Sequence, residues 1–162
     1  PADPPLGRDP DNWLAAAARR RRDTFASCEE AYEHYAGRPS LARVDPAALH
    51  AYVSYGFDRA PDGSVRLKCR PQHEARIYEM ATAHDCFGRL GDVRCPVMLA
   101  CGGASEACLP GPAREIAARL PRPSTEELPG LGHLGPLQDP AAVAASIARY
   151  VGTGPPAETS SA

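Results

Sequence analysis

The sequence feature that most constrains the fold is an apolar run that follows Pro96. Residues 97–101, Val-Met-Leu-Ala-Cys, are continuously apolar, which is typical of a strand buried on both faces of a parallel sheet. A helical pattern begins at Pro112, and residues 124–128 are suited to a second strand. This order predicts a β-α-β unit with two parallel strands.

A last helix is predicted after the second strand, because Asp139 can cap it and Pro140 can occupy its first turn. Four apolar side chains are expected to face inward from this helix, namely Val143, Ile147, Tyr150 and Val151. Two strands with flanking helices leave both sheet edges and most of one face uncovered. The chain also begins with Pro1 rather than methionine, so we expect a portion of a larger α/β fold.

The residues before this unit have the pattern of short helices joined by loops. Four helices and one short strand are predicted there: helices at 12–23, 28–37, 46–56 and 72–83, and the strand at 65–69. Asp11 is expected to cap the first helix, and the arginine run 19–22 to form its solvated end. Nine of the ten aromatic residues lie before residue 88. They are suited to line a pocket, or to form a small core of their own.

Bulk composition excludes several classes of partner. Eighteen basic and 20 acidic residues give a net charge of −2, which argues against a nucleic-acid surface. No run approaches 18 apolar residues, so no membrane span is expected. The opening PADPPLGRDP has no signal-peptide pattern, and a cytoplasmic location is predicted. Residues 1–10 are expected to be an extended connector, and residues 153–162 a disordered tail.

The cysteines do not predict a metal site. The chain has six, with no C-x-x-C pair and no zinc-finger spacing. We expect them to be buried free thiols, and no metal is predicted.

An acid and a histidine each follow a predicted strand. Glu106 comes shortly after the first strand and His133 after the second, and the carboxyl ends of neighbouring parallel strands meet at one sheet edge. Glycines flank His133 at positions 132 and 135, which lets the backbone turn tightly enough to aim an imidazole into a cleft. His133 is therefore the predicted general base and Glu106 its predicted partner.

The remaining reactive side chains lack such a setting. Ser105 and Cys108 do not lie in a Gly-x-Ser-x-Gly elbow, so neither is expected to be a nucleophile. The other four histidines are expected to be surface or locally bonded residues: His34, His50, His73 and His84.

Several of these segments together resemble the C-terminal half of the α/β-hydrolase family. They are CPVMLACG at 95–102, Glu106, LPGLGHLGPL at 128–137 and the Asp139-Pro140 pair that opens a helix. The resemblance covers residues 90–151. It implies a partial α/β-hydrolase fold, with a mainly helical cap at 11–88 followed by a β-α-β-α part of the parallel sheet at 89–152.

The resemblance also implies a mechanism. In family order the nucleophile precedes the cap and the acid and histidine follow it, so the nucleophile would lie in a missing N-terminal half of the same fold. His133 would be the general base and Glu106 the acid. The family more often has an aspartate one position earlier, and an acid after the sixth strand, in the absent part, stays an alternative to Glu106.

A function follows from that resemblance. The intact protein would hydrolyse a small, hydrophobic substrate, an ester if the nucleophile is serine, or an epoxide or carbon–halogen bond if it is aspartate. Neither a metal nor an organic cofactor is needed for this mechanism. The alternative is a non-catalytic member that uses the scaffold as a binding or interaction module. Oligomeric state is not predicted.

Overall fold

The computed structural model describes residues 12–81, 84–105 and 110–153 of the 162. The chain divides into two compact units, residues 1–86 and residues 87–162. The predicted connector at 1–10, the predicted cap residue Asp11 and most of the predicted tail lie outside the described residues.

The first unit contains the four predicted helices. They are α1 (Trp13–Arg19), α2 (Cys28–Ala36), α3 (Pro46–Gly56) and α4 (Pro71–Met80), with a short 3₁₀ turn, η1 (Pro39–Leu41). The caps that the sequence predicts for α2 and α3 are present: the side chain of Ser27 accepts from Glu30 N at 3.2 Å, and that of Asp45 from Ala48 N at 3.0 Å. Helix α1 is shorter than predicted and is capped by Asn12.

A small antiparallel sheet in this unit was only partly predicted. Its strands are β1 (Thr24–Phe25), β2 (Phe57–Arg59) and β3 (Val65–Leu67), in the order β1-β3-β2. The expected strand at 65–69 is β3, while β1 and β2 are too short to show a period-two pattern in the sequence. The unit is therefore a mixed module rather than a purely helical one.

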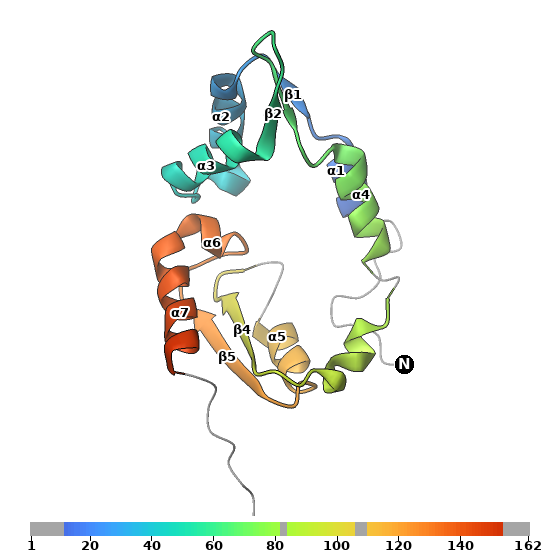
Figure 1. Ribbon diagram of the computed structural model, residues 1–162, viewed down its shortest axis with the longest axis vertical. Coiled ribbons are helices and arrows are strands. Elements are labelled where there is room, and N and C mark those ends of the chain that lie inside the picture. Colours follow the sequence, from blue (N-terminus) through green and yellow to red (C-terminus); the bar gives the residue numbers. More distant parts are fainter. Residues whose placement is uncertain (1–11, 82–83, 106–109, 154–162) are drawn as a thin grey trace, which may run out of the picture. The chain divides into compact units, whose positions relative to one another are not determined.

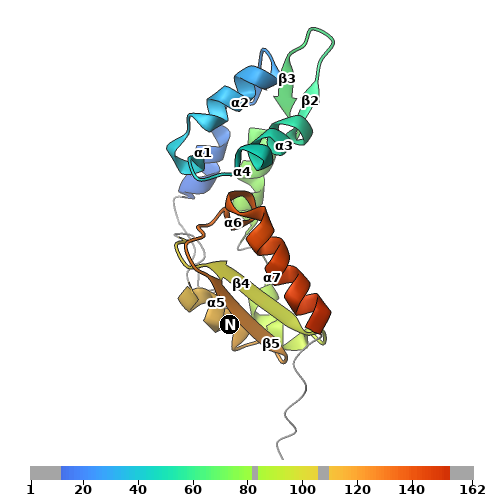
Figure 2. The same ribbon diagram turned by 90° about the vertical axis from the view of Figure 1, so that its left-hand side faces the viewer.

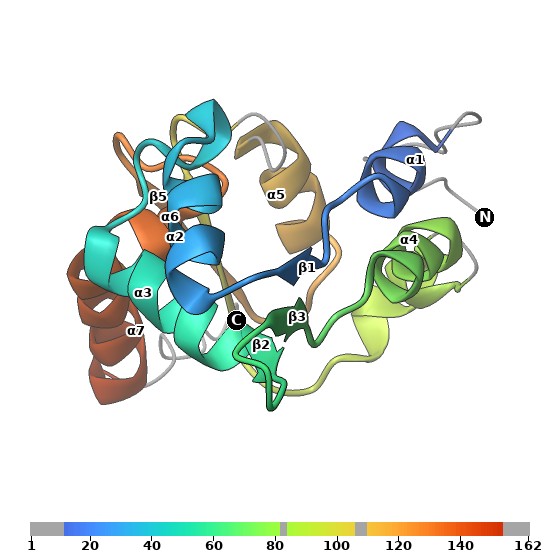
Figure 3. The same ribbon diagram turned by 90° about the horizontal axis from the view of Figure 1, so that it is seen from above.

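Most aromatic residues of the first unit form its core. The Phe25 ring lies 6.0 Å from the ring of Tyr35 and 5.8 Å from that of Phe57, within the usual range of aromatic pairs. Leu49 and Val53 from α3 complete this cluster together with other buried residues of the sheet and α2. A second, alanine-rich cluster joins α1 to α4, which Figure 3 shows side by side.

The arginine run after α1 is not simply a solvated helix end. Arg21 is half-buried, donates to the hydroxyls of Tyr35 at 3.3 Å and Tyr52 at 3.0 Å, and is paired with Glu74 of α4. Burial opposes its charge, but these hydroxyls and the Glu74 carboxylate outweigh burial and raise the pKa of Arg21 above its ordinary value. The other three arginines of the run are exposed as predicted. The prediction is wrong for Arg21 alone, because periodicity does not show which charged side chain turns inward.

The second unit has the predicted β-α-β-α order. After the 3₁₀ segment η2 (Cys86–Asp92) come β4 (Val97–Gly102), α5 (Pro110–Ala117), β5 (Pro123–Leu128), the short α6 (Gly135–Gln138) and α7 (Pro140–Thr153). Strands β4 and β5 are parallel, with register running from Val97 opposite Pro123 to Gly102 opposite Leu128. Helices α5 and α7 lie on opposite faces of this sheet (Figures 1 and 2).

Strand β4 is less buried than predicted. Cys101 is its one buried residue and Ala100 is exposed, because among the described residues β4 pairs with β5 alone. Helix α7 likewise differs from expectation: Ile147 and Val151 are 54% and 73% exposed.

A polar contact fastens α7 to the sheet. The Glu126 carboxylate of β5 accepts from the hydroxyl of Ser146 at 2.5 Å and from Arg149 at 2.6 Å. Ser146 is 1% exposed. The Ser146 hydroxyl first, and then Arg149, lower the pKa of Glu126 below its ordinary value although partial desolvation opposes them.

Replacing Arg21 by methionine should destabilise the protein, because Glu74 and the two tyrosine hydroxyls lose their shared donor. We expect a loss of about 1–3 kcal/mol in the free energy of unfolding, measured by urea denaturation. Arg20→Met is the matched control, since Arg20 is exposed and should change little. Equal losses in the two variants would contradict the role given to Arg21.

Glu126→Gln should weaken the dependence of stability on acid pH. The folded-state pKa of Glu126 is lowered, so its contribution is complete above the unfolded pKa and is lost as pH falls through the folded pKa. Thermal midpoints measured from about pH 5 down to about pH 3 should therefore fall less steeply in the variant. Glu127→Gln, at an exposed neighbour, should keep the wild-type slope, and an unchanged slope in Glu126→Gln would refute the assignment.

Candidate functional site

The loops that follow β4 and β5 are hydrogen-bonded to each other. Beyond the last ladder pair, Gly103 N donates to Leu128 O at 2.9 Å and Ala104 N donates to Leu131 O at 2.9 Å. The loop that leads to Glu106 and the loop that carries His133 thus begin side by side at one sheet edge, as the sequence predicts. Glu106 itself lies outside the described residues, so its pairing with His133 stays a prediction.

This junction requires glycine at the end of β4. A Cβ atom on Gly102 would lie 2.3 Å from the carbonyl oxygen of Leu131 and 2.5 Å from that of Gly132, closer than any real contact. The loop after β5 turns at Gly130, whose φ of +77° is in the region that favours glycine. Two glycines therefore bring the histidine loop down onto the strand end.

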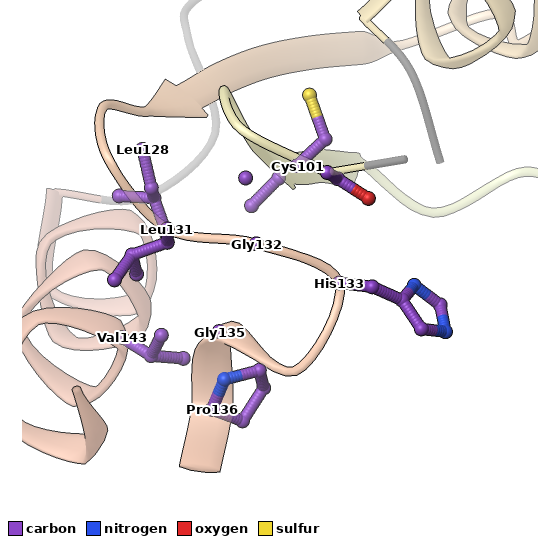
Figure 4. A pocket seen from close by; sticks show the side chains of 11 residues that line it. Cys101, Leu128, Leu131, Gly132, His133, Gly135, Pro136 and Val143 are labelled. Carbon is purple, nitrogen blue, oxygen red and sulfur yellow. The ribbon is translucent and has the colours of Figure 1, made fainter. Parts of the chain in front are cut away.

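His133 is exposed at the outside of a tight turn between Gly132 and α6. Figure 4 shows its imidazole projecting away from the side chains of Leu131 and Val143. An exposed imidazole at a sheet edge, on a backbone fixed by the strands beneath it, is available to accept and donate a proton. The structure thus places His133 at the carboxyl edge of the strand pair, and no ion pair joins it to an acid among the described residues.

A cavity of about 270 Å³ lies beneath the histidine loop. Its wall is mainly apolar, with Leu128, Leu131, Pro136 and Val143, and Cys101 reaches it from β4. The imidazole of His133 stands at its margin and points away from it (Figure 4). The described lining suits apolar groups and contains no carboxylate, lysine or arginine.

Most of the described cysteines are not buried as expected. Among those described, Cys69, Cys86 and Cys95 are exposed, Cys28 is half-buried and Cys101 is buried. Cys108 lies outside the described residues. Loop and turn positions explain the exposure, because the bulk hydrophobicity of cysteine does not say which segment is covered. Within the described ranges, no three His, Cys, Asp or Glu side chains gather as a metal site.

Three of the other histidines have local contacts. His34 lies 5.1 Å from the Phe25 ring and its Nε2 is 2.9 Å from Arg38, and His50 stacks on Tyr32 at 4.0 Å. His84 accepts from Cys86 N at 3.4 Å, while His73 is exposed on α4. The prediction that these four are surface or locally bonded residues fits these settings, and the catalytic role of His133 stays a prediction.

Sequence reasoning missed Gln138, the last residue of α6. Its side-chain oxygen accepts a 2.6 Å hydrogen bond from the backbone N–H of Gly132, the residue before the histidine. The available signal was an amide side chain five positions after His133, at the end of a short predicted loop. This spacing alone does not predict a contact, because the bond forms only when the loop folds back and brings Gln138 to Gly132.

Of the comparisons with known proteins, only the one with solved structures finds matches, and these identify the fold. No protein-family model matches the sequence, and no curated protein matches it. Among solved structures, the peroxisomal α/β-hydrolase Lpx1 from Saccharomyces cerevisiae superposes with a TM-score of 0.72 at 21% identity, over 93% of this chain and 42% of that one. E-2-(acetamidomethylene)succinate hydrolase gives 0.71 at 17% identity, over 86% and 52%. An esterase from Mycobacterium tuberculosis gives 0.62 at 15%, over 89% and 47%.

These likenesses show that the chain has part of the α/β-hydrolase fold, as the resemblance in sequence indicates. The chain spans about half the length of the solved structures it matches. No helix in the described part of the chain is long and apolar enough to cross a membrane.

Gly102→Ala should disrupt the histidine loop, because the new methyl group would meet two backbone carbonyls that cannot rotate away. Overpacking of this kind costs about 1–3 kcal/mol or more in stability, measurable by denaturant unfolding. Gly88→Ala is the matched control, since nothing lies within 4 Å of a Cβ there. A Gly102 variant as stable as the Gly88 variant would show that the loops can separate.

Proposed function

We propose that this chain forms the cap and the acid–base arm of an α/β-hydrolase, and that the intact protein hydrolyses a small hydrophobic substrate, an ester in the first place. One observation carries the proposal: the exposed imidazole of His133 stands on a glycine-bounded loop at the carboxyl edge of a parallel strand pair. That edge is where open α/β sheets keep their ligand sites. The fold agrees with esterases and other hydrolases among the structural neighbours.

The proposed reaction needs a nucleophile from residues outside this chain. A serine hydroxyl would attack the ester carbonyl while His133 takes its proton, and the tetrahedral intermediate would expel the alcohol as His133 returns that proton to the leaving oxygen. Water would then release the acid by the same route. Glu106 would orient the imidazole and stabilise its charged form. An aspartate nucleophile would instead open an epoxide or displace a halide.

The uncovered surfaces of the second unit support a partner half of the same fold. Among the described residues the outer edge of β4 has no strand beside it, and β4 is apolar from Val97 to Cys101. Strand β5 instead contains Pro123, Glu126 and Glu127. Proline and charged side chains are typical of edge strands, because they discourage pairing with a further strand. We propose that further parallel strands add to β4, and that Ile147 and Val151 of α7 become covered in the intact protein.

His133→Ala in the intact protein should lower kcat for short-chain p-nitrophenyl esters by about 10³-fold or more, because base and acid steps both lose their proton carrier. His73→Ala, at an exposed position on α4, is the matched control and should keep turnover. Circular dichroism and the unfolding midpoint should be unchanged in both.

Three outcomes separate the alternatives. Retained esterase activity in His133→Ala would refute the base assignment. Wild-type protein that turns over no ester, epoxide or haloalkane would favour the binding-module alternative. The 162-residue chain alone should be inactive, since the proposal assigns the nucleophile to residues outside it, and turnover by this chain would overturn that division of labour.

A further inference from the structure

We propose that Gln138 is a positioning residue for His133, a role that rests on the proposed function of that histidine. Its side-chain oxygen lies 2.6 Å from the backbone N of Gly132. This bond joins the residue before the histidine to the last residue of α6.

The backbone on the N-terminal side of His133 is held at every polar group that the structure describes. Leu131 O accepts from Ala104 N at 2.9 Å, and Gly132 O accepts from Gly135 N at 3.1 Å. Gly132 N donates to Gln138. Leu131 N donates to Leu128 O at 3.3 Å. The other three partners are backbone groups, so Gln138 supplies the one contact of the four that a side-chain substitution can remove.

Gln138 packs directly over the glycine that it bonds. A Cβ atom on Gly132 would lie 3.1 Å from Nε2 and 3.3 Å from Oε1 of Gln138, and Gly132 is buried. The carbonyl oxygen of Gly132 also approaches the end of β4, where it lies 2.5 Å from the position that a Cβ atom on Gly102 would take. The residue before the histidine is therefore clamped between the end of β4 and the side chain of Gln138, which fixes the direction in which the chain enters His133.

Gln138 is held by backbone bonds of α6 and lies next to the residue that caps α7. Gln138 N donates to Leu134 O at 3.0 Å, and the next residue, Asp139, caps α7 by accepting from Ala142 N at 2.9 Å. Helix α7 is in turn bonded to β5 through Ser146 and Glu126. Through these contacts, Gln138 connects the histidine loop to α7 and, through α7, to the sheet.

Loss of the acceptor would leave the buried Gly132 N–H unpaired, and the loop would relax to hydrate it. A misplacement of about 1 Å at a catalytic group costs about 10²-fold in rate. Gln138 touches no reacting atom in this scheme and acts through the backbone of Gly132 and His133.

The test uses kcat and KM of the intact protein with a p-nitrophenyl ester. Gln138→Met keeps the length of the side chain but not the acceptor, and should lower kcat about 10-fold to 100-fold with KM changed by less than about 3-fold. Gln138→Glu keeps an acceptor oxygen and should stay within about 3-fold of wild type in kcat. Gln72→Met, at the exposed glutamine of α4, is the matched control.

A kcat of Gln138→Met near the wild-type value, in an enzyme that His133→Ala inactivates, would overturn this inference and leave the proposed function standing. Turnover retained by His133→Ala would remove the proposed function itself. If Gln138→Met does not fold, amide hydrogen exchange of Gly132 in wild type and Gln138→Glu decides: slow exchange in both supports the clamp, and exchange at the rate of an exposed amide overturns it.

Discussion

The second unit depends on one close approach, between the end of β4 and the loop that follows β5. With no side chain at Gly102, two carbonyl oxygens can lie where a Cβ atom would be, and the adjoining backbone donors of Gly103 and Ala104 then reach Leu128 and Leu131. The position of every later element of the site depends on this contact. The histidine loop, the short helix α6 and the clamp from Gln138 are positioned from the strand end outward.

Local signals made much of this fold predictable from the sequence. Ser27, Asp45 and Asp139 are caps whose side chains bond the first turns of their helices, and capping is a short-range interaction that sequence displays directly. The strand pair and its helices followed from apolar runs and proline positions. The meeting of two loops at one sheet edge followed from topology alone.

Non-local packing was less predictable. Arg21 turns inward because tyrosines from α2 and α3 and a carboxylate from α4 surround it, and no local pattern shows that arrangement. The two-residue strand β1 exists only because β3 pairs with it. Ile147 and Val151 were expected inside, since periodicity marks an apolar stripe without saying how much of it a given stretch of chain can cover. In the candidate site, the flanking glycines predicted a tight loop around His133, whereas the contact of Gln138 with that loop is visible only in the structure.

The contacts of Arg21 also bear on how the first unit melts. One aromatic cluster holds α2, α3 and the small sheet, and a separate alanine-rich cluster holds α1 and α4. Each is small enough to open by itself, but a single guanidinium bonds tyrosines of the first and a carboxylate beside the second. If either cluster opens, the charged guanidinium of Arg21 loses part of its hydrogen-bond partners. We therefore expect the two clusters to unfold together, with fluctuations of the helices shared between them.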